Sequence, residues 1–162
     1  MDYFTFRRDF ELKLSKLKTP SDCSVQEAAW EVIAPPLGWQ VEMIVDFKDR
    51  KHIRIWESYD KIAGLMISRK VQWAYHYGHT ESVDTFGRAL RGSPDDPLEL
   101  RIDTCSGLHM HYQAREPHYA QEEIGGLDLQ RVEAFSFIRA VLKHRKTGKP
   151  FTNILGFRIK GK

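Results

Sequence analysis

A nine-residue segment with an apolar residue at every second position constrains the fold of this 162-residue chain more than any other stretch. In the segment WQVEMIVDF, every second residue is apolar: Trp39, Val41, Met43, Val45 and Phe47. Successive side chains of a β-strand point to opposite faces, so this period predicts a strand with one buried face. The polar stretch KDRK follows, and residues 52–59 have the composition of a returning strand. We therefore expect an antiparallel hairpin here.

Three further strands are predicted after the hairpin. They cover residues 65–77, 98–102 and 108–112, in which apolar and polar residues again alternate. Residues 78–97 are rich in Gly, Ser, Asp and Pro, a composition typical of a loop. Because the apolar residues alternate and do not form continuous runs, antiparallel pairing is favoured over parallel pairing.

Helices are expected before and after these strands. Residues 2–17 carry apolar side chains at steps of three and four, although their parity also fits a strand. Residues 24–33 begin with a Ser-x-x-Glu capping box and precede two prolines. The last helix, residues 128–146, has Asp128 as its N-cap and an apolar stripe along one face. The predicted fold class is α+β: an antiparallel sheet of about five strands packed by two or three helices.

The composition is that of one globular domain, with 41% hydrophobic and 29% charged residues. We expect residues 1–146 to form a single α+β domain, and residues 147–162 to be a basic segment of the same domain or a tail. The chain has no apolar run of membrane-spanning length, its N-terminus lacks the apolar core of a signal peptide, and it has two cysteines. These features predict a soluble protein of the reducing cytoplasm that does not bind membranes.

Residues 98–118 concentrate the side chains that titrate near neutral pH or bind metal ions. Strand parity places Arg101 and Asp103 opposite the apolar residues of their strand, and it does the same for His109 and His111. Alternate side chains on one strand face lie about 7 Å apart, within joint reach of one small ligand or phosphate group. We therefore expect these four residues to form one polar patch if their strands pair.

One interpretation of this patch is metal-independent cleavage of an RNA phosphodiester, without a cofactor. His109 and His111 would be the acid–base pair, since an unperturbed imidazole titrates near pH 6.5. Arg101 would hold the phosphate, and Asp103 would orient a histidine. Four nearby residues are predicted to contact the substrate: His76, Tyr112, Arg115 and His118.

Two other interpretations remain open. A His-x-His pair on one strand face directs two imidazoles to the same side, so His109 and His111 are able to bind a metal ion together with Asp103, His118 or His76. Alternatively, these residues form a solvated sheet face or an interaction surface without catalysis. The C-terminal twenty residues contain seven Lys or Arg and no acid, which suits nucleic acid or an acidic partner. The residues of this segment expected to contact nucleic acid are Lys143, Arg145, Lys146, Lys149, Arg158 and Lys160.

Two short segments resemble a family of prokaryotic toxins. Residues 73–76 (WAYH) are similar to the Tyr-x-Tyr-His strand of the TumE-like toxins, and residues 100–103 (LRID) to the Arg-x-Asp strand before their histidine-rich loop. The likeness covers about residues 71–112, and residues 104–106 (TCS) replace an Asn-Ala-Pro-like turn. The resemblance implies a compact growth-inhibiting toxin that acts on RNA and has an antitoxin protein as its partner.

Overall fold

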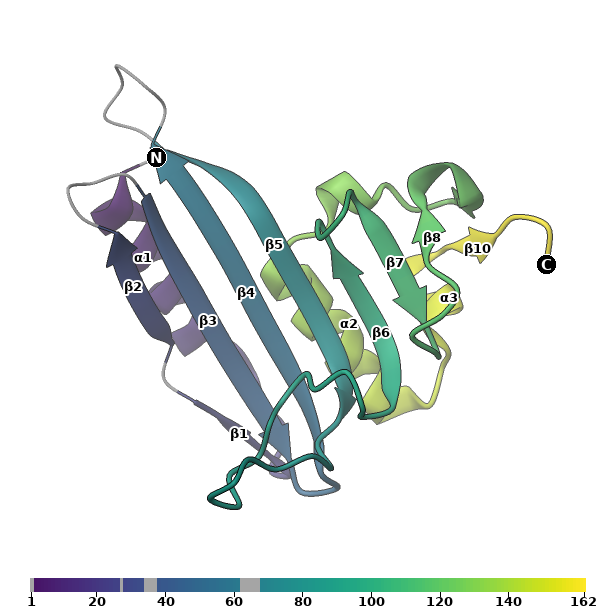
Figure 1. Cartoon of the computed structure of the whole chain (residues 1–162), viewed down its shortest axis with the longest axis horizontal. Helices are drawn as coiled ribbons and strands as arrows, with labels where there is room; N and C mark the ends of the chain where they lie inside the picture. The colour runs from purple at the N-terminus through teal and green to yellow at the C-terminus, as the bar shows by residue number, and fades with distance from the viewer. Residues whose placement is uncertain (1, 27, 34–37, 62–67) are drawn as a thin grey trace.

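The computed structural model describes residues 2–26, 28–33, 38–61 and 68–162 (Figure 1). No helix among these residues is long and apolar enough to cross a membrane. In chain order the helices and strands are α1 (Tyr3–Ser15), β1 (Cys23–Val25), β2 (Ala29–Ile33), β3 (Gly38–Phe47), β4 (Lys51–Lys61), β5 (Ser68–His79), β6 (Leu98–Asp103), β7 (His109–Tyr112), β8 (Tyr119–Ala120), η1 (Gln121–Glu123), β9 (Ile124–Gly125), η2 (Leu129–Arg131), α2 (Ala134–Thr147), α3 (Phe151–Leu155) and β10 (Arg158–Ile159).

The described residues form an eight-stranded antiparallel sheet in the order β1-β3-β4-β5-β6-β7-β8, and β2 pairs with the other end of β3. The α+β class and the β3–β4 hairpin are therefore confirmed. The predicted strand at 65–77 corresponds to β5, although residues 65–67 lie outside the described part of the chain. The expected number of about five strands is too low, because β1, β2 and β8 are short edge strands without a readable alternation.

Helices α1 and α2 lie on the same face of the sheet, behind it in Figure 1. The apolar side chains that alternate along the strands are buried against these helices. The ring of Phe137 in α2 lies 5.7 Å from that of Tyr75 in β5, and Phe10 of α1 lies 5.0 Å from Phe135 of α2. We use the name open face for the other side of β3–β7, which points away from both helices. The loop at residues 80–97 crosses part of this face (Figure 1).

The prediction of a helix at residues 24–33 is wrong, because this segment forms β1 and β2. Glu27, the second half of the expected capping box, lies outside the described residues. Trp30 packs edge-on against three aromatic rings of α1 at 5.4–5.9 Å, and its strand forms a full ladder with β3. These long-range contacts outweigh local helix propensity, which is worth only tenths of a kcal/mol per residue.

The last long helix begins later than predicted. Asp128 accepts a hydrogen bond at the start of η2, but the chain is extended at Val132 and Glu133, and α2 begins at Ala134. The predicted C-terminal end is close to the observed one, since Gly148 ends the helix with φ of 70°. Residues 147–162 include α3 and β10, and two phenylalanines of this segment, Phe151 and Phe157, are buried in the core.

Two stacked histidines lie beneath the loop at 80–97. His52 and His76 have parallel rings with centroids 5.0 Å apart and exposed fractions of 0% and 3%. Nδ1 of His52 lies 2.6 Å from the hydroxyl of Thr80, whereas neither ring nitrogen of His76 has a partner among the described residues. Burial lowers the pKa of His52 to about 4 and also lowers the pKa of His76. Both rings are therefore uncharged at neutral pH.

This pair predicts a loss of stability in mild acid. An unfolded histidine binds its proton near pH 6.5, while the folded chain resists protonation of His52 until about pH 4. The free energy of unfolding should be highest above pH 6.5 and should fall between pH 6.5 and 4, by about 3 kcal/mol for His52 alone. Urea unfolding across this range measures the effect, and His76→Leu should make the fall smaller. An unchanged pH dependence in His76→Leu would contradict this account.

Candidate functional site

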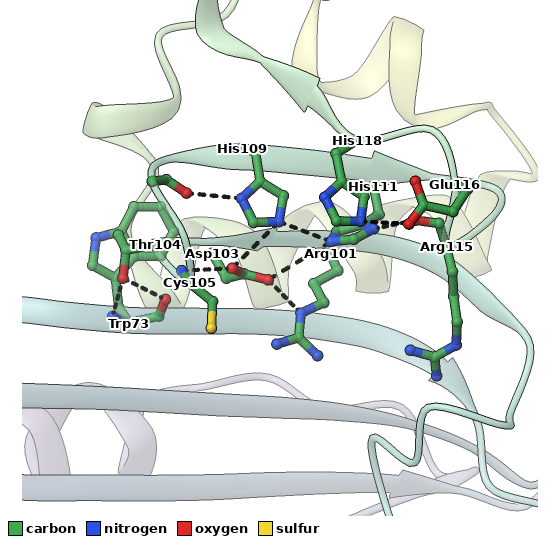
Figure 2. A network of polar contacts seen from close by, with 11 residues as sticks. Trp73, Arg101, Asp103, Thr104, Cys105, His109, His111, Arg115, Glu116 and His118 are labelled. Carbon is green, nitrogen blue, oxygen red and sulfur yellow. Dashed lines mark hydrogen bonds and ion pairs between the residues drawn. The ribbon is translucent and has the colours of Figure 1, made fainter.

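The pairing of β6 with β7 brings four predicted site residues together on the open face. Arg101 lies opposite His111, and Asp103 lies opposite His109. Their neighbours Leu100, Ile102 and Met110 are fully buried on the other side, against the helices. The parity of the apolar residues in the sequence thus also sets the direction of the polar ones. Figure 2 shows the resulting network.

Asp103 is the centre of this network. Its carboxylate accepts a hydrogen bond of 2.5 Å from Nε of Arg101 and one of 2.8 Å from the backbone N–H of Cys105. The same carboxylate lies 3.5 Å from Nε2 of His109 and 3.9 Å from Nε2 of His111. The Asp103 side chain is only 1% exposed, so the guanidinium and the amide take the place of the water it has lost.

The two strand histidines are held in defined tautomers. Nδ1 of His109 lies 2.8 Å from the carbonyl oxygen of Gly107, and Nδ1 of His111 lies 2.6 Å from that of Arg115. A carbonyl oxygen only accepts hydrogen bonds, so each Nδ1 carries a proton, and each neutral imidazole has its lone pair on Nε2. These two Nε2 atoms face each other at 2.9 Å. Burial also lowers the pKa of His111, which favours its neutral form.

His118 completes the cluster, although strand parity did not define its direction because it follows β7. Its ring stacks on that of His109 at 4.8 Å and meets the ring of His111 edge-on at 4.2 Å. Nε2 of His118 also lies 3.0 Å from a carboxylate oxygen of Glu116. One nitrogen from each of the three imidazoles lies within 4.8 Å of the others. We call His109, His111 and His118 the histidine cluster.

Three other predicted substrate contacts lie outside the cluster. Tyr112 points to the helix face and packs edge-on against Phe157 at 5.2 Å. His76 is opposite Arg101 in the neighbouring strand, but its ring stacks on His52. The guanidinium of Arg115 donates to the backbone carbonyls of Ser93 and Asp96, which ties the loop at 80–97 to the segment that carries His118.

Of the basic residues expected to contact nucleic acid, three lie on α2, Lys149 lies between α2 and α3, Arg158 is on β10 and Lys160 follows it. Helix α2 covers the face of the sheet opposite the histidine cluster (Figure 1). Arg145 is engaged there, because it forms ion pairs of 2.9 Å with both Asp22 and Asp49 and donates to the hydroxyl of Tyr77. A cleft of about 810 Å³ adjoins Arg145, and the histidine cluster does not line it. It therefore has no geometric link to the histidine chemistry.

A smaller cleft of about 220 Å³ opens directly beside Asp103 on the open face. Trp56, Gln72 and Ala74 line it together with Arg101, and sequence reasoning did not select these three as site residues. The alternation of β5 already placed Gln72 and Ala74 on the face opposite Tyr75. What the sequence could not supply is the order of the strands, which places β5 beside β6 and β4 on the other side of β5.

Comparisons with known proteins assign neither a family nor a function to this chain. No protein-family model matches the chain, and no curated protein or solved structure is significantly similar to it. The interpretation of the site therefore depends on its own geometry.

Proposed function

We propose that the histidine cluster binds a divalent transition metal ion, with Zn²⁺ as the first candidate. The observation that carries this proposal is the 2.9 Å separation of the Nε2 atoms of His109 and His111. Since both Nδ1–H groups donate to carbonyl oxygens, the lone pairs of two neutral rings would face each other, and the contact becomes favourable when a proton is shared between the two Nε2 atoms or when one metal ion binds to both. Two nitrogens bound to one tetrahedral zinc at about 2.0 Å are about 3.3 Å apart, close to the separation here.

The surroundings of the cluster suit a metal centre. Histidine ligands commonly donate their second N–H to a carbonyl or carboxylate, as His109 and His111 do to Gly107 and Arg115. Three imidazoles leave one position of a tetrahedral ion for water, and zinc lowers the pKa of bound water to about 7. The Asp103 carboxylate, 3.5 Å from Nε2 of His109, is placed to accept a proton from such a water.

The same distance counts against a metal-independent histidine pair. Two histidines that cleave one phosphodiester act at the attacking oxygen and at the leaving oxygen, on opposite sides of the phosphorus. With their Nε2 atoms 2.9 Å apart, His109 and His111 leave no space for a phosphorus atom between them. The geometry therefore favours the metal interpretation over acid–base catalysis by the pair alone.

The reaction we propose is metal-dependent hydrolysis of a phosphodiester, with RNA as the substrate class. Arg101 supports this choice, because only its Nε is engaged, by Asp103, among the hydrogen bonds of the described residues, which leaves its two terminal nitrogens for an anionic group. The segments that resemble TumE-like toxins are also neighbours, since residues 74–77 of β5 pair with residues 100–103 of β6. This supports the further proposal of a toxin with an antitoxin protein as its partner.

Metal binding is tested by titrating Zn²⁺ into chelator-treated, dialysed protein in a calorimeter. We expect one ion per chain with micromolar or tighter affinity, and a loss of about a hundredfold in His109→Ala and His111→Ala because each removes a direct ligand. His79→Ala is the matched control, since His79 is on β5 outside the cluster. Equal affinity in the parent protein and His111→Ala would overturn the assignment.

The reaction is tested with labelled RNA. Cleavage should disappear with chelator and return with Zn²⁺ or Mn²⁺, and Arg101→Gln should lower kcat/KM about a hundredfold while Zn²⁺ affinity stays within a few-fold of the parent value. Cleavage that survives chelator but is lost in His109→Ala would restore the metal-independent mechanism. Absence of cleavage in protein shown to bind metal would contradict the proposed reaction and leave the metal site standing.

A further inference from the structure

The cleft beside Asp103 exists because of one small residue. The strand register places Trp56 of β4, Ala74 of β5 and Asp103 of β6 in one row across the open face. Neighbouring strands lie about 4.8 Å apart, so the backbones at Trp56 and Asp103 are about 10 Å apart, with only a methyl group between them. The result is a cleft of about 220 Å³ that leads directly to the carboxylate at the histidine cluster.

The walls of this cleft have distinct chemistry. On one side is the indole of Trp56, whose Nε1 is directed toward β3 by a hydrogen bond of 3.4 Å to Gln40. On the other side is Arg101, whose guanidinium extends from Asp103 over the neighbouring strand (Figure 2). The exposed amide of Gln72 lies at the rim, where it can donate and accept hydrogen bonds.

We propose that this cleft binds the base of a nucleotide, stacked on Trp56, with the attached phosphate at Arg101. A nucleotide joins a flat aromatic ring to an anion, and the indole and the guanidinium line the same cleft. Base stacking on an aromatic side chain accepts every base, and an amide at the rim adds hydrogen bonds to the base edge. The inference rests on the proposed function, because it places the phosphate next to the proposed metal centre.

Arg54 also borders the cleft but is less suited to hold the phosphate. Its Nε and one terminal nitrogen donate to the same carboxylate oxygen of Glu42, at 2.8 and 2.6 Å. The ion pair with Glu42 engages two of the three guanidinium nitrogens of Arg54, whereas the ion pair with Asp103 engages only Nε of Arg101. Arg101 is the cation next to both the cleft and the cluster, so a phosphate bound there is the one presented for hydrolysis.

The test uses metal-free protein in chelator, so that its outcome does not depend on the metal site. Adenosine 5′-monophosphate and ribose 5-phosphate are titrated while the indole N–H signals of the four tryptophans are followed by NMR. The nucleotide should bind at least about tenfold more tightly than the sugar phosphate, and it should shift the signal that is missing in Trp56→Phe. Equal affinities, or an unmoved Trp56 signal, would overturn the proposal.

Two pairs of variants separate stacking from folding. Trp56→Ala should weaken nucleotide binding about tenfold, the size of one lost base–aromatic stack, whereas Trp56→Phe keeps an aromatic wall and most of the affinity. Ala74→Leu should fill the cleft and weaken binding by a similar factor, whereas Ala89→Leu, the same substitution at an exposed loop position outside the cleft, should leave binding unchanged. Ala74→Leu protein that is folded, by its amide NMR spectrum, and binds the nucleotide normally would contradict the proposed position of the base. Failure of zinc binding would leave these results unaffected.

Discussion

The register between β6 and β7 is the constraint on which the site depends. It places Asp103 opposite His109, and a slip of one residue would turn a whole strand's polar groups toward the helices. The register is held by the burial of Leu100, Ile102 and Met110, each with no exposed surface. Because the hydrophobic effect fixes which face these residues occupy, the packing of the core and the geometry of the site follow from the same pairing.

Two buried polar networks on opposite faces of the sheet illustrate different uses of burial. On the helix face, both carboxylate oxygens of Glu57 accept hydrogen bonds, from the hydroxyls of Tyr59 and Tyr75 and from Lys70. Burial and this carboxylate raise the pKa of both tyrosines, which keeps them protonated as donors. Both oxygens of this buried carboxylate thus have donors within the protein, as a buried polar network requires.

The histidine cluster differs because, among the described residues, the Nε2 atoms of His109 and His111 have only each other as hydrogen-bond partners. The Nδ1–H of each strand imidazole is used by the backbone, and the two Nε2 atoms face each other at 2.9 Å near a buried carboxylate. A buried, partly satisfied network is costly, and proteins keep such arrangements where a ligand completes them. This contrast between the two faces, more than the density of reactive residues, is the reason we propose the cluster as the functional site.

Many of the strands, and the face of the sheet that carries the site, can be predicted from the alternation of apolar and polar residues. This prediction does not require knowing which strands pair with each other. The alternation predicted β3, β4, β6 and β7. It also predicted that four polar side chains share one face of the sheet: Arg101, Asp103, His109 and His111. It failed for β2, where Trp30 packs against α1, and for His118, which follows its strand. The cleft at Ala74 depends on the order of strands in the sheet, and that order is a product of long-range packing that no local pattern contains.

X-ray absorption spectroscopy of the zinc-loaded protein tests the central claim most directly, because it counts imidazole ligands without relying on activity. Three histidine ligands should give a first shell at about 2.0–2.1 Å together with the outer-shell scattering typical of imidazole rings, and a four-coordinate ion. A six-coordinate shell of oxygen atoms without imidazole scattering would show that zinc binds elsewhere, and it would contradict the assignment of His109, His111 and His118 as a metal centre.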